Sequence, residues 1–238
     1  MSSADWRSVP PCPVKDEDGF VEFLDTVGIC LWRPMGSPDF PNLADKMDLA
    51  KPDDIWNTWS WKDDLHEARR LFNGKLLAGR PTFVSMDFLP AVIAALGDID
   101  PYTLHERGTL TSEAIRIYEI LSRKRELSTH DLRKEAGLES PAGRAAFERA
   151  VTSLCALFQI CKTVTTGRTR ETYGYRWGLL EDWAPDVLAR AAALRPHDTA
   201  RAVVERLSSF GVSMKPAQWR RLFGWDDETI AAAVGPDK

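Results

Sequence analysis

The stretch LTSEAIRIYEILSRKRELSTHDLRKEAGL, from Leu110 to Leu138, decides how the middle of the chain folds. In its first half, apolar residues recur every three or four positions, which predicts the buried side of a helix: Ala114, Ile117, Tyr118 and Leu121. Thr111 or Ser112 stands where the N-cap of that helix is expected. In the second half, an extended Leu127 and an N-cap at Ser128 or Thr129 precede a short helix that ends at Gly137. The stretch therefore predicts a helix, a turn and a second helix.

A third helix is predicted immediately downstream. Ser140 and Pro141 have the pattern of an N-cap residue followed by a proline at the first helical position. The segment AGRAAFERAVTSLCALF then repeats large apolar residues at the spacing of one helix face: Phe147, Val151, Leu154 and Phe158. If this face is buried, the opposite face with Arg144, Arg149 and Thr152 is left for solvent or for a ligand.

A hairpin is predicted after the third helix, in QICKTVTTGRTRETYGYRW from Gln159 to Trp177. Two runs rich in Thr, Val, Tyr and Trp flank a centre that contains Gly167, Arg168 and Arg170. The predicted order is then helix, short strand, helix, helix, strand, wing and strand. This order resembles that of winged helix-turn-helix domains, a DNA-binding variation on the helix-turn-helix scheme.

The alternation of side chains along a strand assigns the residues of the hairpin to two faces. On the first strand, one face carries Cys161, Thr163 and Thr165. The other face carries Lys162 and Val164. On the second strand one face carries the aromatic residues Tyr173, Tyr175 and Trp177. We expect the aromatic face to pack on the helices.

The C-terminal part of the chain looks like the start of a second domain of this kind. The segment TARAVVERLSSFGVSMKPAQWRRLFGWDDETIAAAV runs from Thr199 to Val234. It predicts a helix, a Phe-Gly break, an extended residue, a short helix that ends at Gly224, and another short helix. We therefore expect residues 181–238 to form a helical, second winged-helix-like unit.

The N-terminal part, residues 1–110, is predicted to be rich in helix. One helix is indicated by the spacing of Phe20, Phe23, Leu24 and Val27. A second is predicted to end near Gly79 and Pro81 and to have an apolar side made of Leu65, Ala68, Phe72 and Leu76. A strand-like TFVS and an apolar helix MDFLPAVIAAL follow. The expected fold class is mainly α, of the α+β type, with domains at 1–110, 111–180 and 181–238.

A cluster of tryptophans, Trp56, Trp59 and Trp61, is the most notable feature of the N-terminal part. We interpret these residues as core, because aromatic side chains supply much of the area that a core buries. The alternative is a platform on which a nucleobase stacks, with Lys62 and Lys75 on phosphates. The acids around the cluster weigh against that alternative: Asp53, Asp54, Asp63 and Asp64.

The two winged-helix patterns, together with WSWKDDLHEARRLFNGKLLAGRPTFVS in the N-terminal part, resemble proteins of the AlkZ/YcaQ type. These are bacterial DNA crosslink-repair glycosylases and their shorter relatives, whose tandem winged helices embrace DNA. The resemblance covers residues 55–234 and implies a DNA-binding fold. The glycosylases carry two glutamines flanking one apolar residue as their catalytic motif, whereas this chain has only Gln159 and Gln218, far apart. The resemblance therefore does not carry the activity over.

The third helix supplies the candidate groove-reading residues. An arginine can donate two hydrogen bonds to guanine, and a threonine can touch a phosphate or a thymine methyl. Arg144, Arg149 and Thr152 are therefore the candidates for contacts in the major groove. Glu148 would repel phosphate unless it pairs with Arg144 or accepts from cytosine. The alternative is a solvated, charged helix face.

The hairpin supplies candidate contacts to the minor groove or to the adjacent phosphates: Lys162, Arg168 and Arg170. Positive charge at a hairpin tip is favoured beside DNA because it releases condensed counterions. Ordinary solubilising arginines would have the same sequence.

Charge is distributed unevenly along the chain, whose formal net charge is -4. Residues 1–110 carry a net charge of -7, residues 111–177 carry +4, and residues 178–238 carry -1. Binding to DNA needs a local positive face rather than a basic total. Only the middle segment offers one.

Several classes of protein are not indicated. The sequence has no apolar run of about 18 residues and no signal-peptide pattern, so we expect a cytoplasmic protein without membrane contact. Its four cysteines and four histidines have no metal-ligand spacing, so we expect no metal and no disulfide framework. No glycine-rich nucleotide loop is present, and we expect no cofactor.

Three functions stay open at this point. The first is a DNA-binding protein related to repair, without demonstrable catalysis, whose partner is duplex DNA. The second is a DNA glycosylase that uses Asp63, Asp64 or Asp87 in place of the glutamine pair. The third is a winged-helix module that binds another protein, because the chain is acidic overall.

Overall fold

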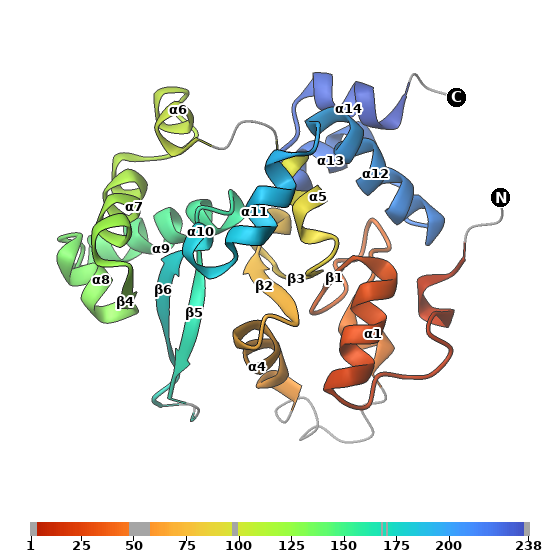
Figure 1. Ribbon diagram of the computed structural model, residues 1–238, viewed down its shortest axis with the longest axis horizontal. Helices are drawn as coiled ribbons and strands as arrows, with labels where there is room; N and C mark the ends of the chain where they lie inside the picture. The colour runs from red at the N-terminus through yellow and green to blue at the C-terminus, as the bar shows by residue number, and fades with distance from the viewer. Residues whose placement is uncertain (1–3, 48–57, 97–99, 168, 170, 236–238) are drawn as a thin grey trace. The chain divides into compact units, whose positions relative to one another are not determined.

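The structure is a computed structural model that describes residues 4–47, 58–96, 100–167, 169 and 171–235 (Figure 1). It divides into two compact units, one formed by Asp98–Leu188 and the other by Met1–Gly97 together with Ala189–Lys238. Each unit has its own cluster of buried apolar side chains. The C-terminal helices thus share a unit with the N-terminal part, and the domain borders after residues 110 and 180 stay a prediction.

The unit Asp98–Leu188 has the element order of a winged helix. Its elements are α6 (Pro101–Glu106), α7 (Ser112–Lys124), β4 (Glu126–Ser128), α8 (Thr129–Glu135), α9 (Pro141–Ala156), β5 (Ile160–Thr166), β6 (Gly174–Leu179), α10 (Leu180–Trp183) and the start of α11 (Pro185–Ala192). The strands form an antiparallel sheet in the order β4-β6-β5. The predicted fold class is confirmed, because three helices and a two-stranded wing follow one another as the sequence indicates.

Helices α7, α8 and α9 begin at residues that the sequence offers as N-caps. The side chains of Thr111, Ser128 and Ser140 each accept a hydrogen bond from the backbone N–H three residues further on, at 3.0 to 3.3 Å. Such a bond satisfies one of the N–H groups that a helix leaves without an intrahelical partner. The chain therefore turns into α7, α8 and α9 at sites that local chemistry selects.

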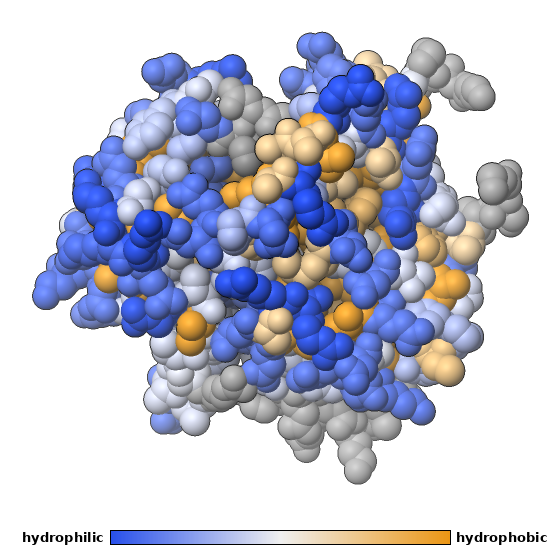
Figure 2. Space-filling view, in the orientation of Figure 1, coloured by the Kyte–Doolittle hydropathy of each residue, from blue (hydrophilic) through white to orange (hydrophobic). Residues whose placement is uncertain are grey.

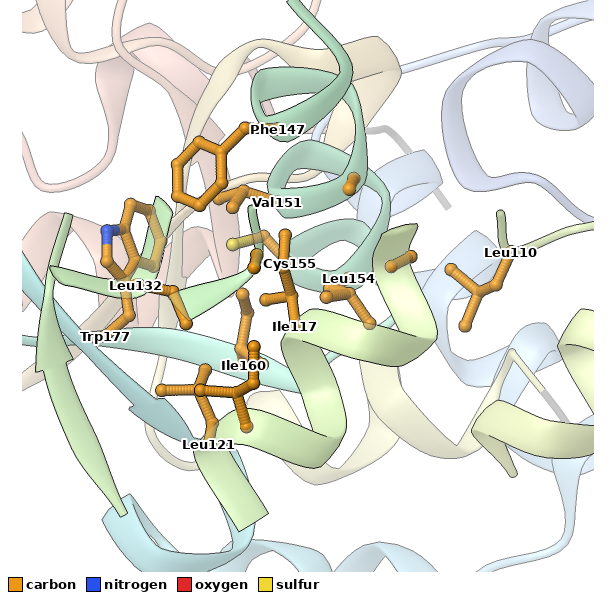
Figure 3. Close-up of a cluster of buried hydrophobic side chains, with 14 of the residues drawn as sticks. Leu110, Ile117, Leu121, Leu132, Phe147, Val151, Leu154, Cys155, Ile160 and Trp177 are labelled. Atoms are coloured by element: carbon orange, nitrogen blue, oxygen red, sulfur yellow. The ribbon is translucent and has the colours of Figure 1, made fainter. Parts of the chain in front are cut away.

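The core of this unit lies between α7, α8, α9 and the sheet (Figure 3). Phe147 and Leu154 of α9 are 1% and 0% exposed, as the spacing of the third helix predicts. Phe147 and Val151 lie on the side of α9 that faces the Trp177 ring of β6 (Figure 3). The aromatic face of the hairpin thus packs on the helices, which confirms that prediction.

The hairpin departs from simple alternation at a bulge. Lys162 pairs with Trp177 and Val164 pairs with Arg176, which leaves Thr163 as an extra residue in β5. Directly paired residues share a face of the sheet, so Lys162 lies on the aromatic face and Val164 does not. The predicted assignment of Lys162 and Val164 to one common face is therefore wrong, because period-two counting cannot detect an inserted residue.

The other unit combines a small sheet with helices from both ends of the chain. From the N-terminal part come short 3-10 turns at Trp6–Ser8 and Leu77–Gly79 and the elements α1 (Glu17–Val27), β1 (Ile29–Leu31), α2 (Leu43–Lys46), α4 (Trp61–Glu67), β2 (Leu71–Lys75), β3 (Pro81–Ser85) and α5 (Leu89–Ala94). The strands pair antiparallel in the order β1-β3-β2. The expected helix with Phe20, Phe23, Leu24 and Val27 is α1, and all four side chains are buried.

One predicted helix of this unit is wrong in its second half. The apolar spacing of Leu65, Ala68, Phe72 and Leu76 predicts a single helix, but α4 ends after Glu67. Arg69 adopts a left-handed conformation with φ of 55°, and the Arg70 N–H bonds to the Leu65 carbonyl at 2.8 Å, which closes the helix. Phe72 then pairs with Val84 in the sheet. Pairing with β3 overrides the helical period, because strand preference depends on tertiary partners.

The C-terminal helices α12 (Pro196–Ser209), α13 (Pro216–Phe223) and α14 (Asp227–Val234) follow the predicted order. Helix α12 packs on α14 and on α5. Trp219 and Trp225 stack with ring centroids 5.1 Å apart and an interplanar angle of 6°, and Phe223 contacts both rings. This aromatic group fixes α13 and the turn that follows it.

The helices that the structure describes include none that is both long enough and apolar enough to cross a membrane.

Candidate nucleic-acid interface

The solvent side of α9 carries the predicted groove residues. Arg144, Glu148 and Arg149 are exposed and Thr152 is half-buried. The opposite side of the same helix is held in the core by Phe147 and its neighbours. The helix is therefore fixed along one face and presents two guanidinium groups on the other.

Neither arginine of α9 is committed to another side chain. Within the described part of the chain, the side chains of Arg144 and Arg149 make no hydrogen bond and no ion pair. The pKa of Glu113 on α7 is lowered by hydrogen bonds from its own backbone amide and from Thr111, and the charges of Arg116 and Arg149 add to this. Arg149 thus lies on the side of α9 nearer to α7. Both arginines keep all their donors for a ligand.

The first turn of α9 packs closely on the turn before it. A Cβ added to Gly143 would lie 2.8 Å from the Cα of Leu138 and 2.9 Å from its carbonyl oxygen, closer than real Cβ atoms approach backbone. Among the small residues at this helix start, Gly143 therefore serves the fold. Ala142 and Ala145 are exposed, so no long side chain projects from the outer surface of the first turn at these two positions.

The wing holds two of its cations in internal contacts. The Nζ of Lys162 lies 3.9 Å from the centroid of the Tyr175 ring, a cation–π geometry. The Nε of Arg176 donates to Glu126 at 2.6 Å, and the Thr163 hydroxyl donates to the same carboxylate. Lys162 thus braces the hairpin from within it, and its predicted contact with DNA stays a prediction.

Arg168 and Arg170, the predicted contacts at the tip of the wing, lie outside the described residues. The turn beside them requires glycine. Gly167 has φ of +77°, and a Cβ there would lie 2.3 Å from the carbonyl oxygen of Thr172.

The wing is also tied to the start of α8. The indole N–H of Trp177 donates to the Thr129 hydroxyl at 2.9 Å, and that hydroxyl donates to the Tyr175 carbonyl at 3.2 Å. These bonds join β6 to the residue that opens α8. The second helix and the wing therefore form one rigid frame around α9.

Sequence reasoning missed cations on α8. Lys134 is exposed, Arg133 is half-buried, and the Arg133 Nε is a buried donor without an acceptor among the described residues. By contrast, Lys124 pairs with Glu135 at 2.6 Å. The signal for this second basic element was the adjacent Arg–Lys pair inside a helix-turn-helix pattern. The surface over α7 and α8 is largely hydrophilic (Figure 2).

The acids considered for catalysis do not gather at one place. Asp63 is 4% exposed, and its Oδ2 lies 2.5 Å from the Nζ of Lys62. Burial lowers the pKa of Lys62, and the charge of Asp63 opposes that shift. Asp64 is half-buried, whereas Asp87 is exposed and lies 3.6 Å from Arg190. No pair of these acids has the shared, solvent-accessible geometry of an acid–base site.

The tryptophans of the N-terminal part pack against its core. Trp59 and Trp61 are half-buried beside the apolar cluster of that unit, and Trp59 meets Trp32 edge to face with ring centroids 5.2 Å apart. The Nζ of Lys62 lies 4.4 Å from the Trp59 centroid. Trp56 lies outside the described residues. The described members of the cluster thus have the packing role expected of core aromatics.

No metal-binding constellation occurs in the described ranges, since no three His, Cys, Asp or Glu side chains lie together there. None of the four cysteines is in a disulfide, and burial raises the pKa of Cys30 far above its usual range. A buried, protonated thiol of this kind is inert.

A solved structure shares the fold of this chain. The Streptomyces sahachiroi DNA glycosylase AlkZ matches with a TM-score of 0.50 at 14% sequence identity. The match covers 98% of this chain and 65% of that protein, so the chain spans less than two thirds of its length. At this identity the likeness shows the fold alone. No curated protein sequence matches the chain.

A family model gives the more direct relationship. It is the model described as AlkZ related, and it matches residues 14–224. The match begins at Val14, a buried residue bridged to Met47, and ends at Gly224, the C-cap of α13. The match therefore covers all of one unit and most of the other, and the chain belongs to the AlkZ-related family.

Proposed function

We propose that the unit Asp98–Leu188 binds duplex DNA by placing α9 in the major groove. The observation that carries this proposal is the pair of exposed, uncommitted arginines, Arg144 and Arg149, on a helix whose other face is fixed in the core. A rigid helix loses little freedom when it enters a groove. Its arginines can then donate bidentate hydrogen bonds to guanine, the commonest specific contact in the major groove.

The remaining residues of the exposed face refine the proposal. Thr152 has a methyl group and a hydroxyl, so it can contact a thymine methyl or a phosphate. Glu148 lies four residues after Arg144, makes no ion pair with it, and can accept from cytosine N4. A carboxylate in this position disfavours indiscriminate phosphate binding, and it therefore favours a sequence-dependent mode of contact.

Helix α8 and the wing would flank the groove contact. Arg133 and Lys134 on α8 would meet phosphates, as the helix before the recognition helix does in helix-turn-helix proteins. Arg168 and Arg170 at the wing tip would meet the adjacent backbone or minor groove. Phosphate contacts of this kind position a protein without specifying sequence.

A repair-related role follows as the second part of the proposal. Membership of the AlkZ-related family and the shared fold with a DNA glycosylase both support it. We propose that the role is DNA binding without base excision, because the glutamine pair of the glycosylases is absent and the acids are dispersed.

The test compares single arginine variants in duplex binding. A preferred duplex is first selected from a random pool, and affinity is then measured by fluorescence anisotropy. Arg149→Ala should lose about 1–3 kcal/mol on the preferred duplex and much less on an unrelated one. Arg144→Ala should behave similarly. The matched control is Arg221→Ala, which removes an exposed arginine of α13 and the same charge.

Two outcomes would contradict the proposal. One is that Arg144→Ala and Arg149→Ala bind both duplexes as tightly as the parent does. The other is that Arg221→Ala weakens binding as much as either of them, which would indicate an effect of net charge alone. In the first case the exposed face of α9 would be better explained as a protein-binding surface.

A further inference from the structure

The unit formed by residues 1–97 and 189–238 contains a cavity that none of the interactions proposed above uses. It has a volume of about 370 Å³ and lies where β1 ends, beside α2. Its lining residues are Trp32, Arg33, Pro34, Ala44, Asp45, Met47 and Thr58. The size is within the range of small-ligand sites, and a mostly apolar wall with a few polar groups is their usual composition.

The indole of Trp32 is fixed at the wall of this cavity. Its side chain is 8% exposed, and its ring is held by Trp59 and by Phe83, whose centroid lies 6.0 Å away. The backbone is fixed as well, because the Trp32 N–H donates to Pro81 at 3.1 Å and its carbonyl accepts from Ala44 at 3.1 Å. The ring therefore cannot turn away from the cavity.

The indole N–H of Trp32 has no acceptor within the described part of the chain. Two other indole nitrogens there, those of Trp6 and Trp225, also lack acceptors but are cut off from solvent. Trp32 differs from these two because it lines the cavity and is 8% exposed. An indole N–H without a protein acceptor, on a residue that lines an apolar cavity, can donate to an acceptor on a ligand.

Arg33 adds an uncommitted positive charge. Its side chain is exposed and makes no hydrogen bond or ion pair with any described residue. The nearby carboxylate of Asp45 is already engaged, since it accepts from Asn42 at 3.0 Å and lies 3.7 Å from Arg7. The cavity therefore offers an anion one free guanidinium that Asp45 does not neutralise.

We propose that this cavity binds a single nucleotide, with its base between the apolar walls and its phosphate on Arg33. A nucleobase is flat, carries acceptors in its plane for the Trp32 N–H, and fills part of a site of this volume. A phosphate matches the planar guanidinium of Arg33 by charge and by bidentate geometry. Pro34, Ala44 and Met47 supply apolar surface to the lining. The proposal goes beyond the DNA interface on α9 and depends on none of its residues.

Calorimetric titration of the full chain with thymidine monophosphate and deoxyadenosine monophosphate tests this proposal. Arg33→Ala should weaken binding of either nucleotide about tenfold, because one charge-assisted contact is lost. Trp32→Phe removes the donor but keeps an aromatic ring, and it should weaken binding about fivefold. The matched control is Arg80→Ala, an exposed arginine of the same unit outside the cavity, and its affinity should equal that of the parent.

The indole N–H resonances of the parent protein give a second readout, for which Trp32→Phe is needed only to assign the Trp32 resonance. The sequence contains nine tryptophans, and the resonance that Trp32→Phe removes identifies Trp32. That resonance should shift when a monophosphate is added, and it should shift less with thymidine or with inorganic phosphate alone. A short single-stranded oligonucleotide distinguishes the two sources of the ligand: if it shifts the resonance as well, the cavity accepts a nucleotide within a strand, and otherwise a free one.

Three results would overturn the proposal: no heat or shift with any monophosphate, equal affinity in the parent and in Arg33→Ala, or a monophosphate that shifts other indoles but leaves Trp32 unchanged. Arg149→Ala keeps the cavity intact, so its affinity for the monophosphates should be that of the parent even if its affinity for duplex DNA falls. Failure of one proposal is thus distinguishable from failure of the other.

Discussion

A single carboxylate, Glu126, joins three strands of the winged unit. It begins β4, it accepts from Arg176 of β6 at 2.6 Å, and it accepts from the Thr163 hydroxyl of β5. Burial alone would raise the pKa of Glu126, but the hydrogen bonds from Thr163 and Arg176 and the charge of Arg176 outweigh burial and lower it. The ionised form is therefore the one that holds the base of the wing.

The pH dependence of stability tests this role. Because the pKa of Glu126 is lower in the folded state, its contribution is present above the unfolded pKa of about 4.5 and is lost as pH falls through the folded value. Glu126→Gln should cost about 1 kcal/mol at neutral pH, a small value because the pair is about one third exposed. Urea denaturation at a series of pH values should show the difference from the parent shrinking below about pH 4. A difference that is constant with pH would contradict this role.

Basic residues that carry the same charge differ in whether their donors remain available to a ligand. Arg176 and Lys162 lie in the hairpin, yet one is bonded to Glu126 and the other lies over the Tyr175 ring. Arg149 carries the same charge and is left to solvent. A count of basic residues cannot separate the two classes, because only contacts decide which donors remain for a ligand.

Among the elements, α9 owes its position to the close approach at Gly143. The Cβ of any other residue there would meet the backbone of Leu138, which cannot move without shifting α8 or the first turn of α9. Backbone contacts at this distance are less forgiving than contacts with the far end of a flexible side chain.

Gly143→Ala should therefore destabilise the protein by about 1–3 kcal/mol, although alanine is the better helix former by about 1 kcal/mol. The measurement is urea denaturation followed by circular dichroism. The matched control, Ala145→Ser, adds one atom on the exposed side of the same turn and should change stability by at most about 0.5 kcal/mol. A stabilised Gly143→Ala variant would mean that α9 and Leu138 are not packed as described.

The wing makes a different prediction, about salt rather than stability. If Arg168 and Arg170 each neutralise one phosphate, replacing both with alanine should reduce the log–log salt slope of duplex binding by roughly 1.8, at about 0.9 per contact. The loss should be the same for all duplex sequences, because phosphate contacts carry no sequence information. Thermal melting of the variant serves as the control for folding. A salt slope equal to that of the parent would rule out a DNA-contacting wing.

At the scale of the whole molecule, the family of the chain is known, and the positions of its glutamines bear on its chemistry. The chain belongs to the AlkZ-related family, but its two glutamines lie in different places: Gln159 precedes β5, and Gln218 caps α13 by accepting from the Lys215 N–H at 2.8 Å. Base excision requires a positioned water and a pocket for the flipped base. Gln218 is committed to its helix and cannot supply the first of these.

We accordingly predict no enzyme-dependent release of bases from alkylated or crosslinked DNA. The assay is single-turnover incubation with excess protein, with base release followed by chromatography against a no-protein control. Asp63 is buried against Lys62, and Asp87 is an exposed side chain beside Arg190, so neither lies in a pocket that could hold a flipped base and a positioned water. Release above the control that disappears in Asp63→Asn or Asp87→Asn would contradict the prediction and establish an acid-dependent glycosylase.

Local patterns in the sequence predict nearly all of the winged unit. Caps at Thr111, Ser128 and Ser140 and the apolar period of α9 are local features, and helices obey them because their hydrogen bonds are local. The identity of the α9 face followed from the same period, since one buried side fixes the other. The AlkZ-type resemblance also rested on such local patterns, and the family match confirms it.

Other features depend on partners that are distant in the sequence, and these are set by tertiary packing. Pairing with β3 makes Phe72 a strand residue, and an inserted residue in β5 puts Lys162 and Val164 on opposite faces of the sheet. The partition of the chain, which joins residues 189–238 to residues 1–97, is also a property of long-range packing. The cavity lined by Trp32 and Arg33 could not be predicted from the sequence for the same reason. Strand pairing, burial and cavities arise from contacts between segments far apart in sequence, and no local pattern encodes which segments meet.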